Sequence, residues 1–249
     1  MAATGDPLGE VLQDLRDEYE RLDEVFSALS SEQWSMPSGA PGWSILDVVV
    51  HLAVSEEGVA STIALQQEGW HHRKGTLDDA IDLTVQANRA TPARVLARWR
   101  AATAASITAL GGADPSRQYR WAAAPLRPRT LATTRLAEHW AHGLDVTDPL
   151  GIAFPDTDRL RHIAWLGHAT IPYGCSLIGV TPEPIQAVLT GPSGDMWTYG
   201  PPDAASTISG PAAAFCRVGA QRLSPGASGL HTTGPFAETA LRVLRNYAA

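Results

Sequence analysis

The fold of this chain is decided by two stretches of sequence, GWSILDVVVHL at residues 42–52 and LAEHWAHG at residues 136–143. In the second stretch, Glu138 and His142 are four residues apart, which places a carboxylate and an imidazole one helical turn apart on one face. His51, from the first stretch, would complete a set of two histidines and one carboxylate. Such a set binds a divalent metal and leaves coordination positions open for water or a substrate. The two stretches therefore predict helices that meet around a catalytic metal ion.

The residues around this pair refine the predicted site. One face of the second helix carries a polar stripe of Arg135, Glu138, His142 and Asp145. His139 lies about 100° around the helix from Glu138, so it is not expected to share that face. Asp145 is predicted to orient His142, since metal-bound imidazoles need such a partner, and Asp47 is predicted to orient His51. An ordinary charged helix surface explains both aspartates equally well.

Composition and charge limit the classes of protein to which this chain can belong. The chain has 249 residues, of which 44% are hydrophobic and 18% charged, as in soluble globular proteins with a substantial core. Its net charge is −7 and its single lysine is Lys74, so the basic surface of a nucleic-acid-binding protein is missing. No apolar stretch of transmembrane length and no signal-peptide pattern is evident, which favours a cytoplasmic protein without a membrane partner. Cys175 and Cys216 are predicted to be buried free thiols.

The first half of the chain has the periodicity of long helices. The predicted helices run from Asp6-Pro7 to about residue 29, from Ser44 past His51, from Thr76 to Gly111-Gly112 with a restart at Thr91-Pro92, and from Thr130 to Asp148-Pro149. Ser44 and Asp47 have the spacing of a capping box, with Trp43 and Val48 as a hydrophobic staple across it. Helices of this length with these connections predict an antiparallel four-helix bundle over residues 1–150.

The second half has a different pattern. A helix is predicted over residues 156–169, followed by short strands at 185–189, 196–199 and 206–208. The first two strands are separated by a Gly-Pro-Ser-Gly-Asp turn at residues 191–195, which predicts a hairpin. Further helices are predicted from Gly210-Pro211 to Leu223 and from Gly234-Pro235 to Tyr247. Residues 151–249 are therefore predicted to form a small α+β domain, and the chain as a whole an α+β protein.

Residues 42–53 and 138–146 resemble the DinB-like superfamily, and in particular its mycothiol-dependent maleylpyruvate isomerase branch. Residues 189–201 and 210–222 resemble the second domain of that branch, so the resemblance covers nearly the whole chain. It implies a metal, typically zinc, at His51, Glu138 and His142, and a C-terminal domain like sterol carrier protein 2. It also implies mycothiol as a low-molecular-weight thiol cofactor. The segments at residues 54–57 and 171–175 depart from the family pattern and are expected to alter the substrate pocket.

The predicted function is that of a metal-dependent, mycothiol-dependent S-transferase or isomerase acting on a small organic electrophile. Arg222, with Arg217 as the weaker candidate, is predicted to clamp a carboxylate or the thiol cofactor. Arg222 and Asp145 are the predicted catalytic residues beside the metal ligands. Two alternatives stay open: a thiol-independent hydrolase or cyclase of actinobacterial secondary metabolism, and a non-catalytic module that binds a small molecule. A monomer and a homodimer are equally compatible with the sequence.

Overall fold

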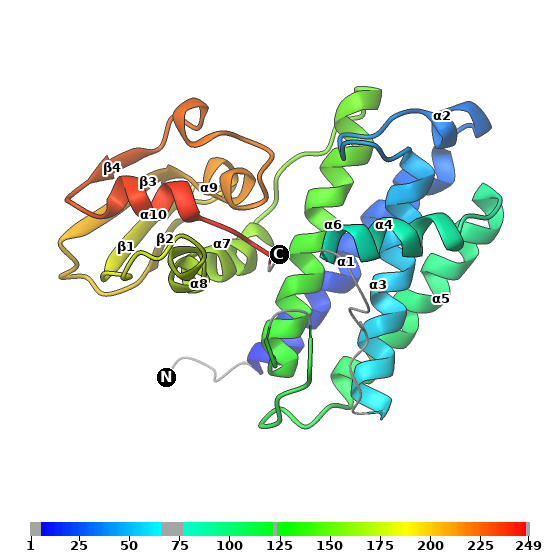
Figure 1. Ribbon diagram of the computed structural model, residues 1–249, viewed down its shortest axis with the longest axis horizontal. Coiled ribbons are helices and arrows are strands. Elements are labelled where there is room, and N and C mark those ends of the chain that lie inside the picture. The colour runs from blue at the N-terminus through cyan, green and yellow to red at the C-terminus, as the bar shows by residue number, and fades with distance from the viewer. Residues whose placement is uncertain (1–5, 66–76, 122–123, 248–249) are drawn as a thin grey trace. The chain divides into compact units, whose positions relative to one another are not determined.

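The structure, a computed structural model, describes residues 6–65, 77–121 and 124–247 (Figure 1). The chain divides into two compact units, one ending at Phe154 and one beginning at Pro155. The first unit is built from helices and the second combines helices with a four-stranded sheet, so the predicted α+β fold class is confirmed. The assignment of residues 1–150 to a metal-binding domain and 151–249 to a second domain stays a prediction.

Four long helices form the N-terminal bundle: α1 (Pro7–Ala28), α3 (Ile45–Leu65), α5 (Pro92–Gly111) and α6 (Pro128–Leu150). α3 packs against α5 and α6, and α1 packs against the same two helices. Two smaller helices complete the unit, α2 (Ser31–Ser35) after α1 and α4 (Leu77–Ala87), which runs crosswise over α3 (Figure 1). The predicted helix start at Thr76 lies outside the described residues.

The helix directions follow from which residues meet. His51 and Ser55 of α3 contact Glu138 and Arg135 of α6, so these two helices are antiparallel. α3 and α5 instead run in the same direction, since the start of α3 pairs with the residues just before α5: Asp47 binds Arg89, and Glu57 binds Arg98. The long connection that includes α4 returns the chain to the same end of the bundle. The predicted antiparallel arrangement therefore holds for α3 with α6 and not for α3 with α5.

The helix that carries His51 is also the most apolar one. α3 meets the length and composition of a membrane-spanning helix, which the sequence was not expected to contain, but 61% of its apolar window is buried inside the unit. Val48, Val49 and Leu52 are fully buried between the neighbouring helices. The composition of α3 is therefore explained by its position in the core of the bundle.

The C-terminal unit contains a sheet in the order β2-β1-β3-β4, formed by β1 (Ile185–Thr190), β2 (Met196–Tyr199), β3 (Ser206–Pro211) and β4 (His231–Thr233). β1 pairs antiparallel with β2 and parallel with β3, and the predicted hairpin is confirmed. Ile185, Ala187 and Leu189 alternate toward the core, and α9 packs against this face. The strand β4 is too short to have been predicted.

The remaining helices of this unit are α7 (Leu160–Ala169), α8 (Ile171–Leu177), α9 (Ala212–Gly219) and α10 (Ala237–Val243), with a 3₁₀ turn, η1, at Pro225–Ala227. α9 ends four residues before the predicted position, because Gln221 adopts a left-handed backbone with φ of 60°, which a helix cannot continue. Cys175 and Cys216 are buried free thiols, as predicted.

Candidate metal centre

The position of His51 is fixed by the way α3 begins. The Ser44 hydroxyl accepts a hydrogen bond from the Asp47 backbone N–H at 3.2 Å, and the Asp47 carboxylate accepts one from the Ser44 backbone N–H at 3.0 Å. This reciprocal pair is the predicted capping box, which satisfies two backbone donors at the helix start. Counted from this start, His51 falls in the second turn of α3, where it contacts α6.

Glu138 is the centre of the candidate site. Its Oε1 lies 2.7 Å from Nε2 of His51 and 3.5 Å from Nε2 of His142. Its other oxygen, Oε2, lies 3.9 Å from Nη2 of Arg135. One ligand atom from each of His51, Glu138 and His142 lies within 4.8 Å of the other two. The three residues chosen from the sequence therefore converge on one point between α3 and α6.

Asp145 holds the far side of the His142 ring. Its Oδ2 lies 2.8 Å from Nδ1 of His142, so the carboxylate accepts the Nδ1 proton and leaves Nε2 facing Glu138. The Asp145 backbone is itself fixed, because the Gly39 N–H donates to its carbonyl oxygen at 2.7 Å. A Cβ on Gly39 would lie 3.0 Å from the Asp145 Cα, so this close approach of the loop depends on glycine. Asp145 therefore lies where it can orient His142, and its predicted role in catalysis stays a prediction.

Asp47 does not have the predicted position behind His51. Its carboxylate accepts hydrogen bonds from Ser44 and forms a bidentate ion pair with Arg89, at 2.6 and 2.9 Å. The helix cap and the Arg89 guanidinium together occupy both carboxylate oxygens, which explains why the prediction was wrong. Nδ1 of His51 has no hydrogen-bond partner among the residues that the structure describes.

Trp43 forms an aromatic wall beside both histidines. Its ring centroid lies 5.1 Å from that of His51 and 6.1 Å from that of His142, with only 19° between the planes of Trp43 and His142. The indole N–H donates to Asp82 of α4 at 2.7 Å, which fixes the orientation of the ring. The sequence identified Trp43 only as part of a helix cap. Its position directly before the helix that carries His51 was the available signal of this second role.

The charges of the cluster follow from burial and hydrogen bonding. Burial would raise the pKa of Glu138, but hydrogen bonds from His142 and His51 and the charge of Arg135 hold it well below its usual range. Burial also opposes the charge on His142, yet the hydrogen bonds to Asp145 and Glu138 raise its pKa to about 9. Burial lowers the pKa of His51, with partial compensation from Glu138. At neutral pH the cluster therefore contains an ionised Glu138, a charged His142 and a neutral His51 that donates to Glu138.

His139 lies on a different face of α6, as predicted. Its ring is fully buried, and Nε2 accepts a hydrogen bond from the Trp99 indole at 3.2 Å. Nδ1 donates to the backbone carbonyl of Arg135 at 3.0 Å, so both ring nitrogens are occupied. Burial, followed by the nearby charge of Arg135, lowers the pKa of His139 to about 3. His139 is therefore a neutral structural residue.

The chemistry of the donor set fits a divalent metal ion. Two imidazole nitrogens and one ionised carboxylate oxygen are a ligand set that zinc accepts in catalytic sites. His142 already has the carboxylate partner that metal-bound imidazoles require. His51, Glu138 and His142 are the residues that would hold the ion.

Comparison with known families places this site in a wider context. The profile of the mycothiol maleylpyruvate isomerase N-terminal domain matches residues 15–147, which is more than half of the chain and includes all three residues of the cluster. The chain belongs to this family. The family resemblance inferred from residues 42–53 and 138–146 is thereby confirmed.

Relatives and solved structures extend the similarity over both units. Uncharacterized proteins from two strains of Mycobacterium tuberculosis are each 35% identical over 250 residues, which is 96% of this chain and 96% of the relative. The crystal structure of the mycothiol-dependent maleylpyruvate isomerase has a TM-score of 0.63 at 16% identity, covering 92% of this chain and 96% of that chain. A histidine-to-alanine mutant of that isomerase gives a TM-score of 0.61 with the same identity and coverage. These structures share the fold of this family member.

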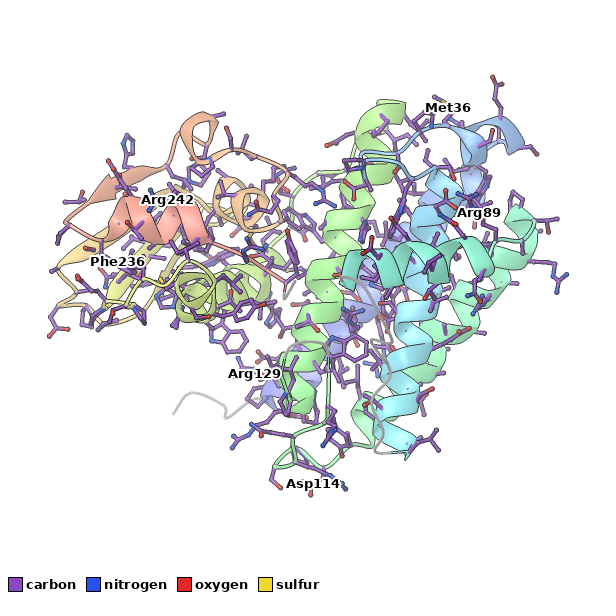
Figure 2. The ribbon with its side chains drawn as sticks, viewed as in Figure 1. Met36, Arg89, Asp114, Arg129, Phe236 and Arg242 are labelled. Atoms are coloured by element: carbon purple, nitrogen blue, oxygen red, sulfur yellow. The ribbon has the colours of Figure 1, made fainter. Side chains whose placement is uncertain are left out.

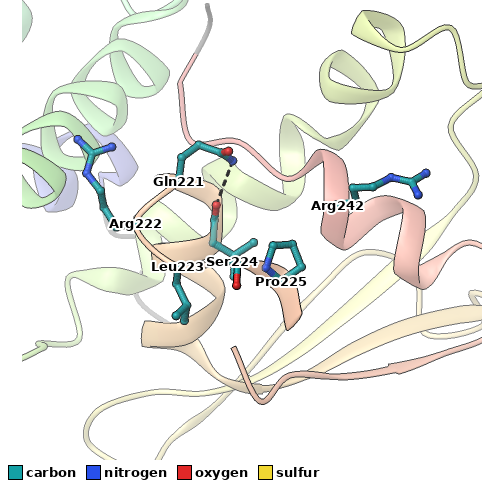
Figure 3. Close-up of a pocket in the computed structure, with 7 residues that line it drawn as sticks. Gln221, Arg222, Leu223, Ser224, Pro225 and Arg242 are labelled. Carbon is teal, nitrogen blue, oxygen red and sulfur yellow. Dashed lines mark hydrogen bonds between the residues drawn. The ribbon is translucent and has the colours of Figure 1, made fainter. Parts of the chain in front are cut away.

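The two predicted arginines belong to the C-terminal unit. Arg222 lines a pocket of about 430 Å³ (Figure 3). Its Nη1 donates to the Ala220 carbonyl at 2.7 Å. Arg242 lines the same pocket, but the two side chains extend to opposite sides of it. Arg217 binds both carboxylate oxygens of Asp156, at 3.0 and 2.9 Å, so an internal ion pair accounts for its guanidinium. Their roles in catalysis and cofactor binding stay predictions, with Arg222 the stronger candidate.

Proposed function

We propose that this member of the family is a metal-dependent enzyme that uses a low-molecular-weight thiol, mycothiol, either to isomerise a small organic electrophile or to form a thioether with it as an S-transferase. The observation that carries this proposal is the convergence of His51 and His142 on one oxygen of an ionised Glu138. Family membership supports the thiol, because the matching profile is that of a mycothiol maleylpyruvate isomerase domain. Zinc is the metal we propose, because it accepts two imidazoles and one carboxylate in catalytic sites.

Each residue of the site has a defined part in this proposal. His51, Glu138 and His142 hold the divalent ion, which when bound lowers the pKa of a thiol so that the thiolate forms at neutral pH. Asp145 keeps Nε2 of His142 directed at the ion by accepting the Nδ1 proton. Trp43 shields the two imidazoles on one side, and its indole is held by Asp82. Arg222 supplies a guanidinium for a carboxylate of the substrate or of the thiol.

The thiolate can act on two kinds of acceptor. With a conjugated alkene, its electron pair forms a C–S bond and the alkene electrons move into the neighbouring carbonyl. Rotation about the resulting single bond and expulsion of the same thiolate then return an isomerised alkene, with no net change in the thiol. With an acceptor that carries a leaving group, the thiolate forms a C–S bond and the leaving group departs with its electron pair, which gives an S-transferase.

A reducing compartment suits this chemistry. A free thiol cofactor and the two buried free cysteines, Cys175 and Cys216, both persist in the cytoplasm, where thiols stay reduced. We therefore keep the cytoplasm as the proposed location.

The test is a reconstitution in which thiol and metal are varied separately. The protein is stripped with a chelator, and turnover of maleylpyruvate and of an electrophile with a leaving group is measured with and without zinc and mycothiol. The expected result is turnover of at least one acceptor that requires both additions and is lost in Glu138→Ala. Turnover that persists without thiol but requires zinc would favour a hydrolase or cyclase. Turnover that persists without both would contradict the proposal.

A further inference from the structure

A buried arginine next to the candidate metal centre has no part in the ligand set. Arg135 is only 4% exposed, and it lies one turn before Glu138 on α6. Its guanidinium contacts the Ser55 hydroxyl through Nη1 and lies over the Trp121 ring, 4.9 Å from the ring centroid. Nη1 also lies 3.7 Å from Oε1 of Glu56, which is fully buried. Ser55, Glu56 and Trp121 therefore determine where this guanidinium can be.

The position of the guanidinium divides the two oxygens of Glu138 between different partners. Oε1 faces both histidines, at 2.7 Å from His51 and 3.5 Å from His142, whereas Oε2 faces Nη2 of Arg135 at 3.9 Å. A carboxylate without a charged neighbour at Oε2 would be able to rotate about its terminal bond, because that torsion is broad and roughly two-fold. A fixed positive charge on one side selects a single orientation of the group.

Glu56 completes this arrangement from α3. Its carboxylate balances the charge of Arg135 and is itself held by the Ser106 hydroxyl of α5. A buried arginine needs such a partner, since an uncompensated charge in the core is strongly destabilising.

We propose that Arg135 is a positioning residue that holds Oε2 of Glu138, so that Oε1 alone is presented to His51 and His142, and that Ser55 and Glu56 hold Arg135 for this task. The effect on metal binding rests on the proposed function, but the effect on the Glu138 carboxylate does not. Arg135 acts through Glu138 and is assigned no contact with the substrate. The positive charge of the guanidinium by itself repels a metal ion, so positioning and charge predict opposite effects of removing it.

The test uses the double variant Arg135→Met with Glu56→Gln, which removes both buried charges together and avoids leaving one of them unpaired. The matched control is Arg98→Met with Glu57→Gln, which removes the bidentate ion pair between α5 and α3 and has no contact with Glu138. Circular dichroism and thermal unfolding establish that both variants are folded. If the first variant does not fold, Ser55→Ala loosens the same guanidinium with both charges kept.

The first measurement is made on metal-free protein by NMR of the histidine side chains. The proton on Nε2 of His51, assigned by its loss in His51→Gln, is expected at low field in the wild type because it is donated to an ionised carboxylate. It should shift upfield or exchange rapidly in the Arg135 variant and stay in place in the control. An unchanged resonance in a folded Arg135 variant would overturn the inference.

The second measurement is the affinity for zinc, by competition with a chromophoric chelator. Loss of a residue that orients a ligand is expected to weaken binding by roughly 10–100-fold, with no change in the control. Equal or tighter binding in the Arg135 variant would overturn the positioning role while leaving the metal centre intact. A wild type that binds no zinc, combined with the expected change in the NMR resonance, would instead overturn the proposed function and leave the positioning of Glu138 supported.

Discussion

The N-terminal bundle and the C-terminal unit bury different kinds of side chain. Among the described residues, the bundle buries seven carboxylate, guanidinium or imidazole side chains: Glu18, Asp47, His51, Glu56, Arg135, His139 and Asp145. The buried polar side chains of the C-terminal unit are His162, Ser206 and Asn246. Burial of a charge is unfavourable unless the charge is paired, so these groups need partners within the bundle. The bundle therefore holds the cluster of His51, Glu138 and His142 on which the proposed function rests.

The largest expected effect is on stability, and it distinguishes His139 from His142, which lie on different faces of α6. His139→Ala removes the acceptor of the buried Trp99 indole and leaves a cavity, so the free energy of unfolding should fall by about 2–4 kcal/mol. The zinc content of the folded variant should stay at one equivalent, because His139 is not directed at Glu138. Chemical denaturation gives the first quantity and metal analysis the second. A variant with normal stability and no zinc would reverse the roles assigned to His139 and His142.

The next largest expected effect is on zinc affinity, and it distinguishes Asp145 from Asp47. Asp145→Asn should weaken zinc binding by roughly 10–100-fold, because the amide is a poorer acceptor for the Nδ1 proton of His142. Asp47→Asn is the matched control, since Asp47 binds Arg89 and the start of α3 and not a histidine. Competition titrations on both variants measure the difference. Equal losses of affinity would show that the bundle transmits any change at α3 or α6 to the metal.

The proximity of His51, Glu138 and His142 was predictable from the sequence because the spacing that underlies it is local, while their role as metal ligands stays a prediction. Glu138 and His142 are on one face of a helix by their four-residue separation, and a bundle brings a histidine of another helix close to them. The network behind Glu138 was not predictable in the same way. The sequence showed Arg135 only as a member of a polar stripe. Its partners Ser55 and Glu56 are about 80 residues away in the sequence, and only the packing of α3 against α6 brings them into contact with it.

The errors in the sequence-based predictions have physical causes of the same kind. Asp47 has the spacing to orient His51, but the helix cap and Arg89 compete for its carboxylate, and Arg89 follows only after α4. α9 was predicted too long because nothing in the sequence shows that Gln221 takes a left-handed backbone. The bundle was predicted to be antiparallel throughout, whereas the long connection that includes α4 lets α5 run in the same direction as α3.

A smaller effect is expected on KM when an arginine of the C-terminal unit is changed, which tests whether the two units have different roles. Arg222→Ala should raise KM for the electrophile or the thiol by about 10-fold, the loss of a hydrogen bond to a charged group, and leave the zinc content unchanged. Arg242→Ala is the control within the same pocket, because its side chain extends to the opposite side (Figure 3). Steady-state kinetics on the zinc-loaded proteins measure the effect. Loss of zinc from Arg222→Ala would contradict the division of roles between the units.

The smallest effect is a pH dependence at the start of α3. Burial opposes the charge of Asp47, but hydrogen bonds from Arg89 and Ser44 lower its pKa below the usual value. A depressed pKa contributes stability above the unfolded value of about 4, and this contribution is lost as the pH falls through the folded value. The wild type should therefore be more stable than Asp47→Asn by about 1 kcal/mol at pH 6, and the difference should shrink at pH 3. Urea unfolding at both pH values is the measurement, and a difference that grows on acidification would contradict it.

Arg89 provides a second way to test the ion pair with Asp47. Arg89 lies beside α4 and α3, well separated along the bundle from Asp114 and Arg129 at the opposite end (Figure 2). Arg89→Gln should reproduce the loss of stability of Asp47→Asn at neutral pH, because either change removes the same ion pair. The two changes combined should cost no more than one of them alone.

Native mass spectrometry of the wild type and of the His51→Ala, His142→Ala double variant tests the central claim most directly. Both proteins are stripped of metal, incubated with zinc and exchanged into a volatile buffer before the measurement. The wild type is predicted to carry one zinc ion, and the double variant, confirmed as folded by circular dichroism, is predicted to carry well below one equivalent. A full equivalent of zinc in the folded double variant would contradict the assignment of His51, Glu138 and His142 as the metal centre.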